Sequence, residues 1–430
     1  MRLPYRFAAC LALLALQALP AAAQDLSWSA FGTVGYAVSD RDYDYQGSID
    51  DRGTFNRDSV LGLQGDLRFD PKWSATVQLK AAQSLKSDDR WDVTPAWAFL
   101  AWRASDDLLI RAGKMRVPFY LYSESMDVGV TYDMARLPVE MYSLAPSTDF
   151  VGLYGTQTWS RGDTELALDV FGGQIGTTAR FWTRDGAPPA VEPGAQFIHV
   201  DVQTEGLALA LKTPRSTWRM GAYRTATWQT DGAAVPVTYP YVSIAPGLGY
   251  FQVDPSLPGP GVPSVSRIHN DILTLGVEQR FATTWRVAAE YARMIQHDTQ
   301  FASDLHAGYV AAFDEIGRFT PYASASLLQS SAGTRAWYRQ LTQNTLPDVV
   351  PGATQVNQAQ RLAAENIWAA DQRSFAVGSS YALDSRQKFK VEWLRTWVGE
   401  MTRLIDTPPG QPTPHDTHVD VWSISYSFTF

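Results

Sequence analysis

The residue types that most often perform catalysis do not form a recognisable active site in this sequence. No histidine lies in an HExxH spacing, and no serine lies in a GxSxG turn. The glycines of 172–176 follow no strand–helix–strand pattern, so we interpret them as a turn-rich strand end and reject a nucleotide-binding loop. We therefore expect no enzymatic activity and no cofactor. The six histidines are His199, His269, His297, His306, His415 and His418.

One group of these residues could bind a metal ion. His415 and His418 lie close in sequence to Asp416 and Asp420, and imidazole and carboxylate groups are common zinc ligands. Spacing alone favours solvated loop residues over a metal site by about four to one. We therefore assign no metal-binding residue.

The segment 1–23 has the organisation of an export signal. Two arginines precede the apolar run 7–19, and three alanines then supply the small residues that signal peptidase requires. The run of about 13 residues is shorter than the roughly 20 that a membrane-spanning helix needs. Cys10 precedes most of the run, which argues against a lipoprotein. Cleavage would leave a mature chain, 24–430, without cysteine and so without disulfides or metal–thiolate sites.

The composition narrows the class of protein. The chain has 36 basic and 44 acidic residues, a formal charge of −8, which disfavours nucleic acid because phosphate binding needs a basic surface. After the signal, no stretch approaches the roughly 18 consecutive apolar residues of a transmembrane helix. The chain nevertheless contains 15 Trp, 19 Tyr and 19 Phe. An exported chain of this kind is typical of a barrel whose wall faces lipid and whose lumen faces water.

Apolar residues alternate with small or polar ones along many segments. In 422–430, Trp, Ile, Tyr and Phe alternate with Ser and Thr, and the same period of two recurs in 61–69, 73–80, 285–291 and 375–383. A soluble sandwich would show this alternation as well. The alternating segments are about 9–12 residues long, which suits tilted transmembrane strands, whereas soluble strands are mostly about 5–6. The pattern predicts an all-β fold, a transmembrane antiparallel β-barrel.

The segments between the expected strands alternate in kind. Short gaps rich in Pro, Asp, Ser and Gly alternate with long gaps such as 40–57, 116–148, 230–269 and 330–371. Short periplasmic turns and long external loops are the layout of an outer-membrane barrel, whose strand number is even. We count about 16 strands, and 14 or 18 stay open because strand boundaries read from sequence shift by a few residues. The expected strands are 28–39, 58–69, 72–83, 94–103, 107–115, 149–159, 164–173, 197–212, 216–229, 270–281, 285–297, 305–314, 318–329, 372–383, 387–398 and 417–430.

The end of the chain carries a resemblance to a known family. The last strand closes with Tyr426, Phe428 and Phe430 at alternate positions. This ending resembles the C-terminal signature of Gram-negative outer-membrane barrels, and with the signal and the strand layout the mature chain resembles bacterial porins. The resemblance implies that the barrel assembly machinery reads these three residues and that the chain forms homotrimers. It also implies surroundings of outer-membrane lipid and lipopolysaccharide.

The resemblance gives a role to the third long loop, 116–148. In general porins this loop folds into the barrel and narrows it. Here it mixes aromatics and prolines with charges of both signs, which suits a loop packed against a wall and facing water. Opposed charges there would exclude solutes by size and charge, although for any single residue a solvated or structurally paired charge is an equal alternative. The expected constriction residues are Lys114, Arg116, Glu124, Asp127, Asp133, Arg136 and Glu140.

Charged residues on the polar faces of the strands are expected to line the lumen. Their basic majority would favour anions inside the pore, but a register error of one residue moves a side chain to the other face. Tryptophans near several strand boundaries fit the aromatic belts at the two membrane interfaces. The expected lumen residues are Arg68, Lys80, Arg280, Arg286, Glu290, Lys388, Lys390 and Glu392.

Together these features predict an exported outer-membrane porin, a water-filled channel for passive diffusion of small hydrophilic solutes or ions. Its selectivity would come from pore width and charge. Two alternatives stay open. One is an outer-membrane barrel enzyme of the lipase or protease type, and the other is a soluble periplasmic β-rich protein that binds a ligand.

Overall fold

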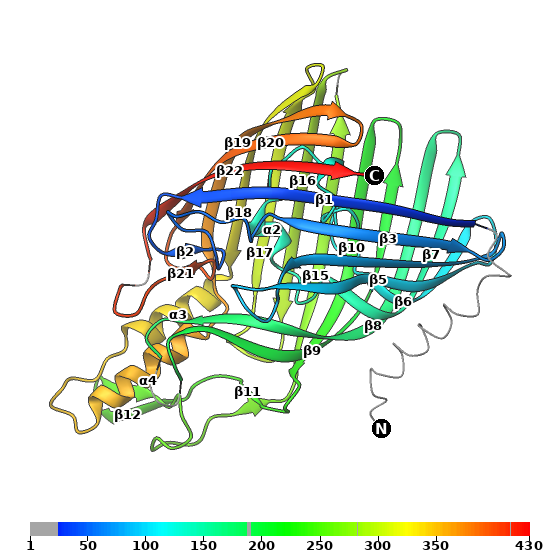
Figure 1. The fold of residues 1–430 in the computed structure, drawn as a ribbon. Helices are drawn as coiled ribbons and strands as arrows, with labels where there is room; N and C mark the ends of the chain where they lie inside the picture. The colour runs from blue at the N-terminus through cyan, green and yellow to red at the C-terminus, as the bar shows by residue number, and fades with distance from the viewer. Residues whose placement is uncertain (1–24, 187–190, 282, 413) are drawn as a thin grey trace.

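The computed structural model describes residues 25–186, 191–281, 283–412 and 414–430. Sixteen antiparallel strands form one closed barrel, in which successive barrel strands pair and the last strand pairs with the first (Figure 1). The predicted fold class and the count of 16 strands are confirmed. The predicted signal peptide, 1–23, lies outside the described residues.

The strand bounds agree with the predicted ranges within three residues at all but one end. The alternation of side chains therefore located the strands correctly. The barrel strands are β1 (Asp25–Ser39), β3 (Val60–Arg68), β4 (Trp73–Gln83), β5 (Trp91–Arg103), β6 (Leu108–Arg116), β7 (Asp149–Arg161), β8 (Thr164–Thr183), β9 (Gly194–Lys212), β10 (Ser216–Gln229), β15 (Ile268–Arg280), β16 (Trp285–Gln296), β17 (Leu305–Asp314), β18 (Phe319–Ser330), β19 (Asp371–Asp384), β20 (Gln387–Val398) and β22 (Thr417–Thr429).

The strand β8 is longer than predicted. It was expected to end at 173, but it continues to Thr183, so the glycines of 172–176 lie within a strand and not at a strand end. The continuation carries β-branched and aromatic residues, which favour extended backbone. Its pairing with β9 runs to Thr183, whereas its pairing with β7 stops at Gln174. The β8–β9 hairpin therefore extends beyond the neighbouring wall of the barrel.

The long connections contain secondary structure that the sequence analysis treated as loop. The segment 330–371 forms two helices, α3 (Ala332–Gln343) and α4 (Ala353–Glu365). With the small strands of 235–265 they make a lobe around buried Phe251, Trp337 and Ile367, at the end of the barrel where β1 finishes (Figure 1). The remaining short elements are β2 (Asp44–Tyr45), β11 (Val235–Pro236), β12 (Tyr241–Ala245), β13 (Leu248–Phe251), β14 (Ser264–Val265), β21 (Ile405–Asp406), η1 (Gly129–Thr131) and α2 (Val139–Tyr142).

Tight turns join the strands at the opposite end of the barrel. The Asp70 carboxylate accepts hydrogen bonds from the backbone N–H groups of Lys72 and Trp73, at 2.7 and 2.8 Å. This side-chain turn closes the β3–β4 hairpin within four residues. In the β7–β8 turn Gly162 has a φ of +59°, a left-handed conformation that glycine adopts without a steric penalty.

The outer face of the barrel is apolar and its inner face is polar, the reverse of a soluble protein. Along β4, Val77 and Leu79 are 48% and 42% exposed, whereas Thr76 and Gln78, which alternate with them, are buried. The same exposure of apolar side chains recurs around the barrel, as at Leu153. Such a surface fits hydrocarbon and not water. Among the described residues, no helix is long and apolar enough to cross a membrane.

Replacing Leu153 by arginine is expected to lower the free energy of unfolding in lipid vesicles by about 2–4 kcal/mol, because the guanidinium would face hydrocarbon. Urea titration of protein folded into phosphatidylcholine vesicles measures the loss. Thr158→Arg is the matched control, since Thr158 faces the interior from the same strand, and it should change stability by less than about 0.5 kcal/mol. Equal losses in both variants would contradict the assignment of the outer face to lipid.

Candidate pore constriction

The segment 117–148, between β6 and β7, folds into the barrel, and we call it the inner loop. Its apolar side chains are buried against aromatic residues of the barrel wall. Phe119 meets Tyr223 of β10 edge to face, with 4.8 Å between the ring centroids. The Tyr223 hydroxyl donates a hydrogen bond of 2.9 Å to the carbonyl oxygen of Pro118. The aromatic and proline content of the segment therefore serves packing inside the barrel.

The inner loop is tied at its start to β4, β6 and β7. Arg116 lies 2.8 Å from Asp127 in the loop and 3.2 Å from Asp149 at the start of β7. Lys80 on β4 lies 3.1 Å from the same Asp127 carboxylate. Burial alone would raise the pKa of Asp127, but Arg116 and Lys80 outweigh it and lower the pKa to about 2. The carboxylate therefore remains charged at neutral pH and holds the loop to the wall.

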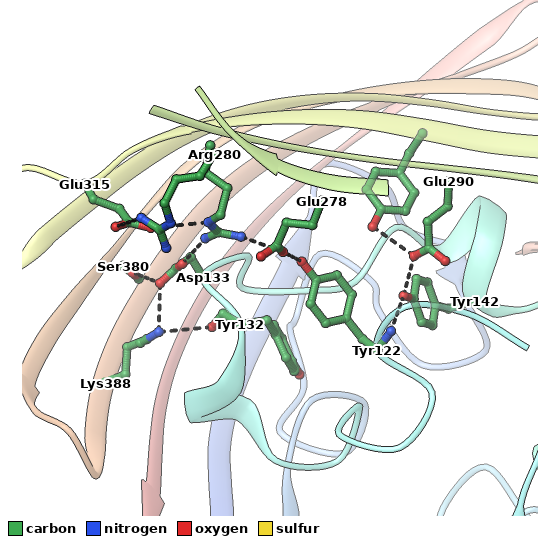
Figure 2. A network of polar contacts seen from close by, with 12 residues as sticks. Tyr122, Tyr132, Asp133, Tyr142, Glu278, Arg280, Glu290, Glu315, Ser380 and Lys388 are labelled. Atoms are coloured by element: carbon green, nitrogen blue, oxygen red, sulfur yellow. Dashed lines mark hydrogen bonds and ion pairs between the residues drawn. The ribbon is translucent and has the colours of Figure 1, made fainter. Parts of the chain in front are cut away.

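A second carboxylate fastens the inner loop to the opposite wall (Figure 2). Asp133 lies 2.5 Å from Arg286 on β16 and 2.7 Å from Lys388 on β20. Ser380 on β19 donates a hydrogen bond of 2.7 Å to this carboxylate. Burial opposes its ionisation, but Lys388 and Arg286 lower the pKa of Asp133. Since β4 and β16 are eight strands apart in the barrel order, the loop spans the lumen.

Hydrogen bonds from tyrosine to glutamate fix the parts of the loop that precede and follow these two anchors. Tyr122 donates to Glu278 on β15, and Tyr142 donates to Glu290 on β16, each at 2.6 Å (Figure 2). The backbone N–H of Leu121 also donates to Glu290, at 2.8 Å. Burial and the neighbouring carboxylates raise the pKa of Tyr122 and of Tyr142, so both remain protonated donors.

Two further charged residues of the inner loop are buried in structural contacts. Arg136 forms a bidentate pair with Asp58, donating from Nε to Oδ1 at 2.9 Å and from Nη2 to Oδ2 at 2.5 Å. Glu140 is 1% exposed and accepts hydrogen bonds from Ser326 and Gln372, at 2.9 and 2.8 Å. Both residues therefore position the loop and do not face a passing solute.

Two expected lumen residues, Lys390 and Glu392, lie beneath the inner loop. Lys390 donates a hydrogen bond of 3.0 Å to the carbonyl oxygen of Met134, and its ammonium lies 3.8 Å from the centre of the Tyr132 ring. Glu392 accepts a hydrogen bond of 2.7 Å from the hydroxyl of Tyr322. Both side chains point inward as expected, but their burial corrects the expectation that they line open water.

The remaining expected residues make no direct contact with the acidic anchors Asp127 and Asp133 of the inner loop. Glu124 and Arg68 are exposed, and neither forms an ion pair with another residue in the described parts of the chain. Glu124 is thus the charge of the inner loop that is most available to solutes. The others are paired on the wall, Lys114 with Asp149 at 3.6 Å and Arg280 with Glu315 at 2.5 Å.

The sequence analysis missed most of the partners of the inner loop. Asp58 and Asp149 were not named because nothing in their local sequence links them to a loop residue. The tyrosines were also missed, although their recurrence within one loop was a usable signal, since buried tyrosine requires a hydrogen-bond partner. The tyrosines of the loop are Tyr120, Tyr122, Tyr132 and Tyr142.

The extended β8–β9 hairpin lies across the end of the barrel at which β1 finishes, and we call it the roof hairpin. Arg180 of β8 pairs with Asp88 in the β4–β5 connection at 2.7 and 2.8 Å. It also pairs with Asp406 of β21 at 2.5 and 3.2 Å. The short strand β21 belongs to the connection between β20 and β22. These two barrel strands lie on the side of the barrel opposite to β8. The hairpin therefore bridges the mouth of the barrel.

The roof hairpin also joins the lobe. The rings of Phe181 and Trp368 meet at right angles, with 6.1 Å between their centroids. The guanidinium of Arg403 lies 5.8 Å from the centre of each of these rings. Arg184 lies 3.5 Å from Glu365 of α4. These contacts make the roof hairpin and the lobe a continuous cover over part of the mouth.

The histidines do not form a catalytic group. His269 lies 2.8 Å from Asp298, and His297 lies 2.8 Å from Asp271, as separate exposed pairs at the rim. His418 does approach two carboxylates, but its neighbours are Asp40 and Asp420 and not the expected Asp416. Arg395 already pairs with Asp420 at 2.7 Å, and this positive charge opposes a bound cation. We therefore keep the assignment of no metal-binding residue.

Known proteins resemble this chain in fold alone. No family model matches the chain, and no curated protein sequence matches it. Among solved structures, OmpT, an outer-membrane protein of Vibrio cholerae, matches with a TM-score of 0.51 at 9% identity, covering 94% of this chain and 98% of OmpT. The loop L8 deletion mutant of OmpT matches with a TM-score of 0.50 at 10% sequence identity, and the match covers 95% of this chain and 100% of the mutant. The anion-selective porin from Comamonas acidovorans matches with a TM-score of 0.48 at 10% identity, and the match covers 94% of this chain and 100% of that porin.

The chain thus has a closed 16-strand barrel similar in fold to OmpT, an outer-membrane protein of Vibrio cholerae. At such low identity the similarity is one of fold, and it identifies neither a family nor a substrate.

Asp127→Asn is expected to destabilise the protein by about 2 kcal/mol at pH 7, because the lowered pKa of this carboxyl reflects about that much favourable interaction. The folded pKa lies below the unfolded value of about 3.9, so the stabilisation is present above pH 4 and disappears as the pH falls through about 2. Urea titrations of wild type and variant at pH 7, 4 and 2 measure it. The difference should be absent near pH 2, and a full difference there would contradict the assignment. Asp348→Asn, on the exposed lobe, is the control.

Arg180→Gln is expected to release the roof hairpin, because Asp406 would stay buried without its charged partner. Backbone hydrogen–deuterium exchange in 175–183 should rise by about tenfold or more, which corresponds to about 1.4 kcal/mol of lost protection. Arg224→Gln is the control, since Arg224 forms an exposed pair with Asp271 on the outer rim. Unchanged exchange in 175–183 would show that Arg180 does not hold the roof.

Proposed function

We propose that this protein is an outer-membrane channel through which small hydrophilic solutes or ions diffuse passively. One observation carries the proposal: the inner loop is fastened across a closed barrel by ion pairs to opposite walls. A loop held in this way narrows the lumen at a fixed place, so it selects solutes by size and charge. The apolar outer face supports residence in a bilayer. Diffusion down a gradient needs no cofactor.

The inner face of β3, which we call the polar wall, carries polar side chains that are partly open to the lumen. There Gln64 and Asp66 are partly exposed, and their polar groups are hydrogen-bonded at 2.8 Å. The opposite wall, from β16 to β22, is covered by the inner loop, as the burial of Lys390 and Ser427 shows. A solute would pass the roof hairpin first and then the gap between the inner loop and the polar wall.

The route to the membrane belongs to the same proposal. The segment 1–23 would direct export and be removed, and the barrel assembly machinery would recognise Tyr426, Phe428 and Phe430. In support, Phe430 is 75% exposed, and its backbone N–H donates a hydrogen bond of 2.8 Å to the carbonyl oxygen of Ala30 in β1. The last residue is thus both accessible and part of the barrel seam. We further propose that the mature protein assembles as a homotrimer surrounded by outer-membrane lipid and lipopolysaccharide.

The purified mature protein is expected to give discrete current steps in a planar bilayer. Under a KCl gradient, Glu124→Lys should shift the reversal potential towards anions, because it replaces the exposed carboxylate of the inner loop with an ammonium. Asp348→Lys changes charge equally but lies on the exposed lobe, so it should leave the reversal potential nearly unchanged. Folded barrel that inserts without current steps would contradict the channel and redirect attention to a barrel enzyme.

A further inference from the structure

Three buried polar atoms without partners lie on adjacent strands of the barrel. They are Trp97 Nε1 on β5, Arg111 Nε on β6 and Tyr154 Oη on β7, and none has a hydrogen-bond partner among the described residues. The strands β5, β6 and β7 are hydrogen-bonded neighbours. Buried polar groups in folded proteins are nearly always bonded, so each exception requires an explanation. These three atoms are themselves shielded from solvent, so a solute would meet the exposed parts of the same side chains.

Arg111 is the centre of this cluster. Its guanidinium lies 4.2 Å from the centre of the Tyr154 ring and 5.9 Å from that of Phe99. One nitrogen, Nη2, donates a hydrogen bond of 3.1 Å to the hydroxyl of Thr156. These contacts hold the guanidinium in a defined orientation, and Nη1 makes no hydrogen bond to a described residue.

Arg111 also lacks the acidic partner that its basic neighbours in the lumen have. Lys80 lies 3.1 Å from Asp127, and Arg219 lies 3.2 Å from Asp169. Within the described parts of the chain, no carboxylate lies within 4 Å of Arg111. Its only link to a carboxylate among the described residues runs through Thr156, whose hydroxyl donates a hydrogen bond of 2.8 Å to Asp169. Arg111 is therefore a partly exposed cation on the inner face of β6 without a direct ion pair.

Aromatic side chains stand next to this unpaired cation. The rings of Trp97 and Phe99 lie 6.3 Å apart on the inner face of β5, and both are partly exposed. Trp97 pairs across the strands with Gln78 of β4, which pairs in turn with Gln64 of β3, so the cluster lies two strands from the partly exposed side chains of β3. A planar apolar group of a solute would fit against these rings.

We propose that Arg111, Trp97 and Phe99 form a binding site for aromatic carboxylates on their way through the lumen. The planar guanidinium fork matches a carboxylate, and the adjacent rings match an aromatic body. The proposal names the solute class of the channel and rests on the proposed function. It requires both the negative charge and the ring of the solute.

The test measures the block of chloride current through single channels by sodium benzoate. Sodium acetate carries the carboxylate without the ring, and benzyl alcohol carries the ring without the charge. In the wild type, benzoate should halve the current at a concentration about tenfold or more below that of either analogue. Equal potency of benzoate and acetate, or of benzoate and benzyl alcohol, would overturn the proposal without any variant.

Variants then locate the site. Arg111→Gln should raise the half-blocking concentration of benzoate about tenfold or more, and Arg111→Lys should raise it less because the charge remains. Arg103→Gln is the matched control, since Arg103 ends the neighbouring strand β5 beside the short turn to β6, and it should not alter the block. An undiminished block in Arg111→Gln would overturn the assignment. If that variant fails to fold, Phe99→Ala should weaken the block by benzoate while leaving that by acetate unchanged.

Different results would contradict the channel and the aromatic carboxylate site. Absence of current steps from folded, inserted protein would contradict the proposed channel itself. Current steps with no preference for benzoate would leave the channel standing and remove only the aromatic carboxylate site.

Discussion

Backbone hydrogen bonding between the first and last strands is the constraint on which the rest of the molecule depends. In an apolar layer an unpaired N–H or C=O group finds no water, so a sheet with a free edge is unstable there. The strand β1 pairs with β22 on one side and with β3 on the other, and the closed barrel has no edge. The closing contact of Thr33 with Ser427 joins residues 394 positions apart. The apolar outer face therefore depends on the whole chain having folded.

Closure also creates the interior in which the inner loop is held. Polar side chains that face inward on sixteen strands cannot all be solvated once a loop covers them, so each covered group needs a partner. Asp127 and Asp133 meet this need with basic residues of opposite walls, and Glu290 meets it with tyrosine hydroxyls. Removing one member of such a pair leaves the other as an unpaired buried charge. The resulting loss of folding free energy is larger than the stabilisation that the intact pair provides. The position of the loop is therefore fixed by electrostatics as well as by packing.

The sequence predicted the strands well because their signal is local and repeated. One apolar and one polar face along each strand is enough to find 387–398 or 216–229 without knowing any partner. The two helices of 330–371 were not predicted, since they are stabilised by burial in the lobe and not by a long apolar pattern of their own. The partners of the inner loop were missed for a related reason. The pairing of Arg136 with Asp58 or of Asp133 with Arg286 depends on the closed barrel, which no local pattern encodes.

These pairings change how charge in the lumen should be counted. The chain carries a net charge of −8, and the residues expected from the sequence on the inner face have a basic majority, yet neither number describes what a solute meets. Most inward charges are neutralised by a partner a few ångströms away, and a neutral pair exerts only a short-ranged field on a passing ion. Among the described residues, the charged groups without an ion-pair partner include Glu124 on the inner loop and Arg68 and Arg111 on the wall, one acidic and two basic. Selectivity then depends on which of these lies closer to the path of the solute, because the field of a single charge weakens over about 8–10 Å in physiological salt.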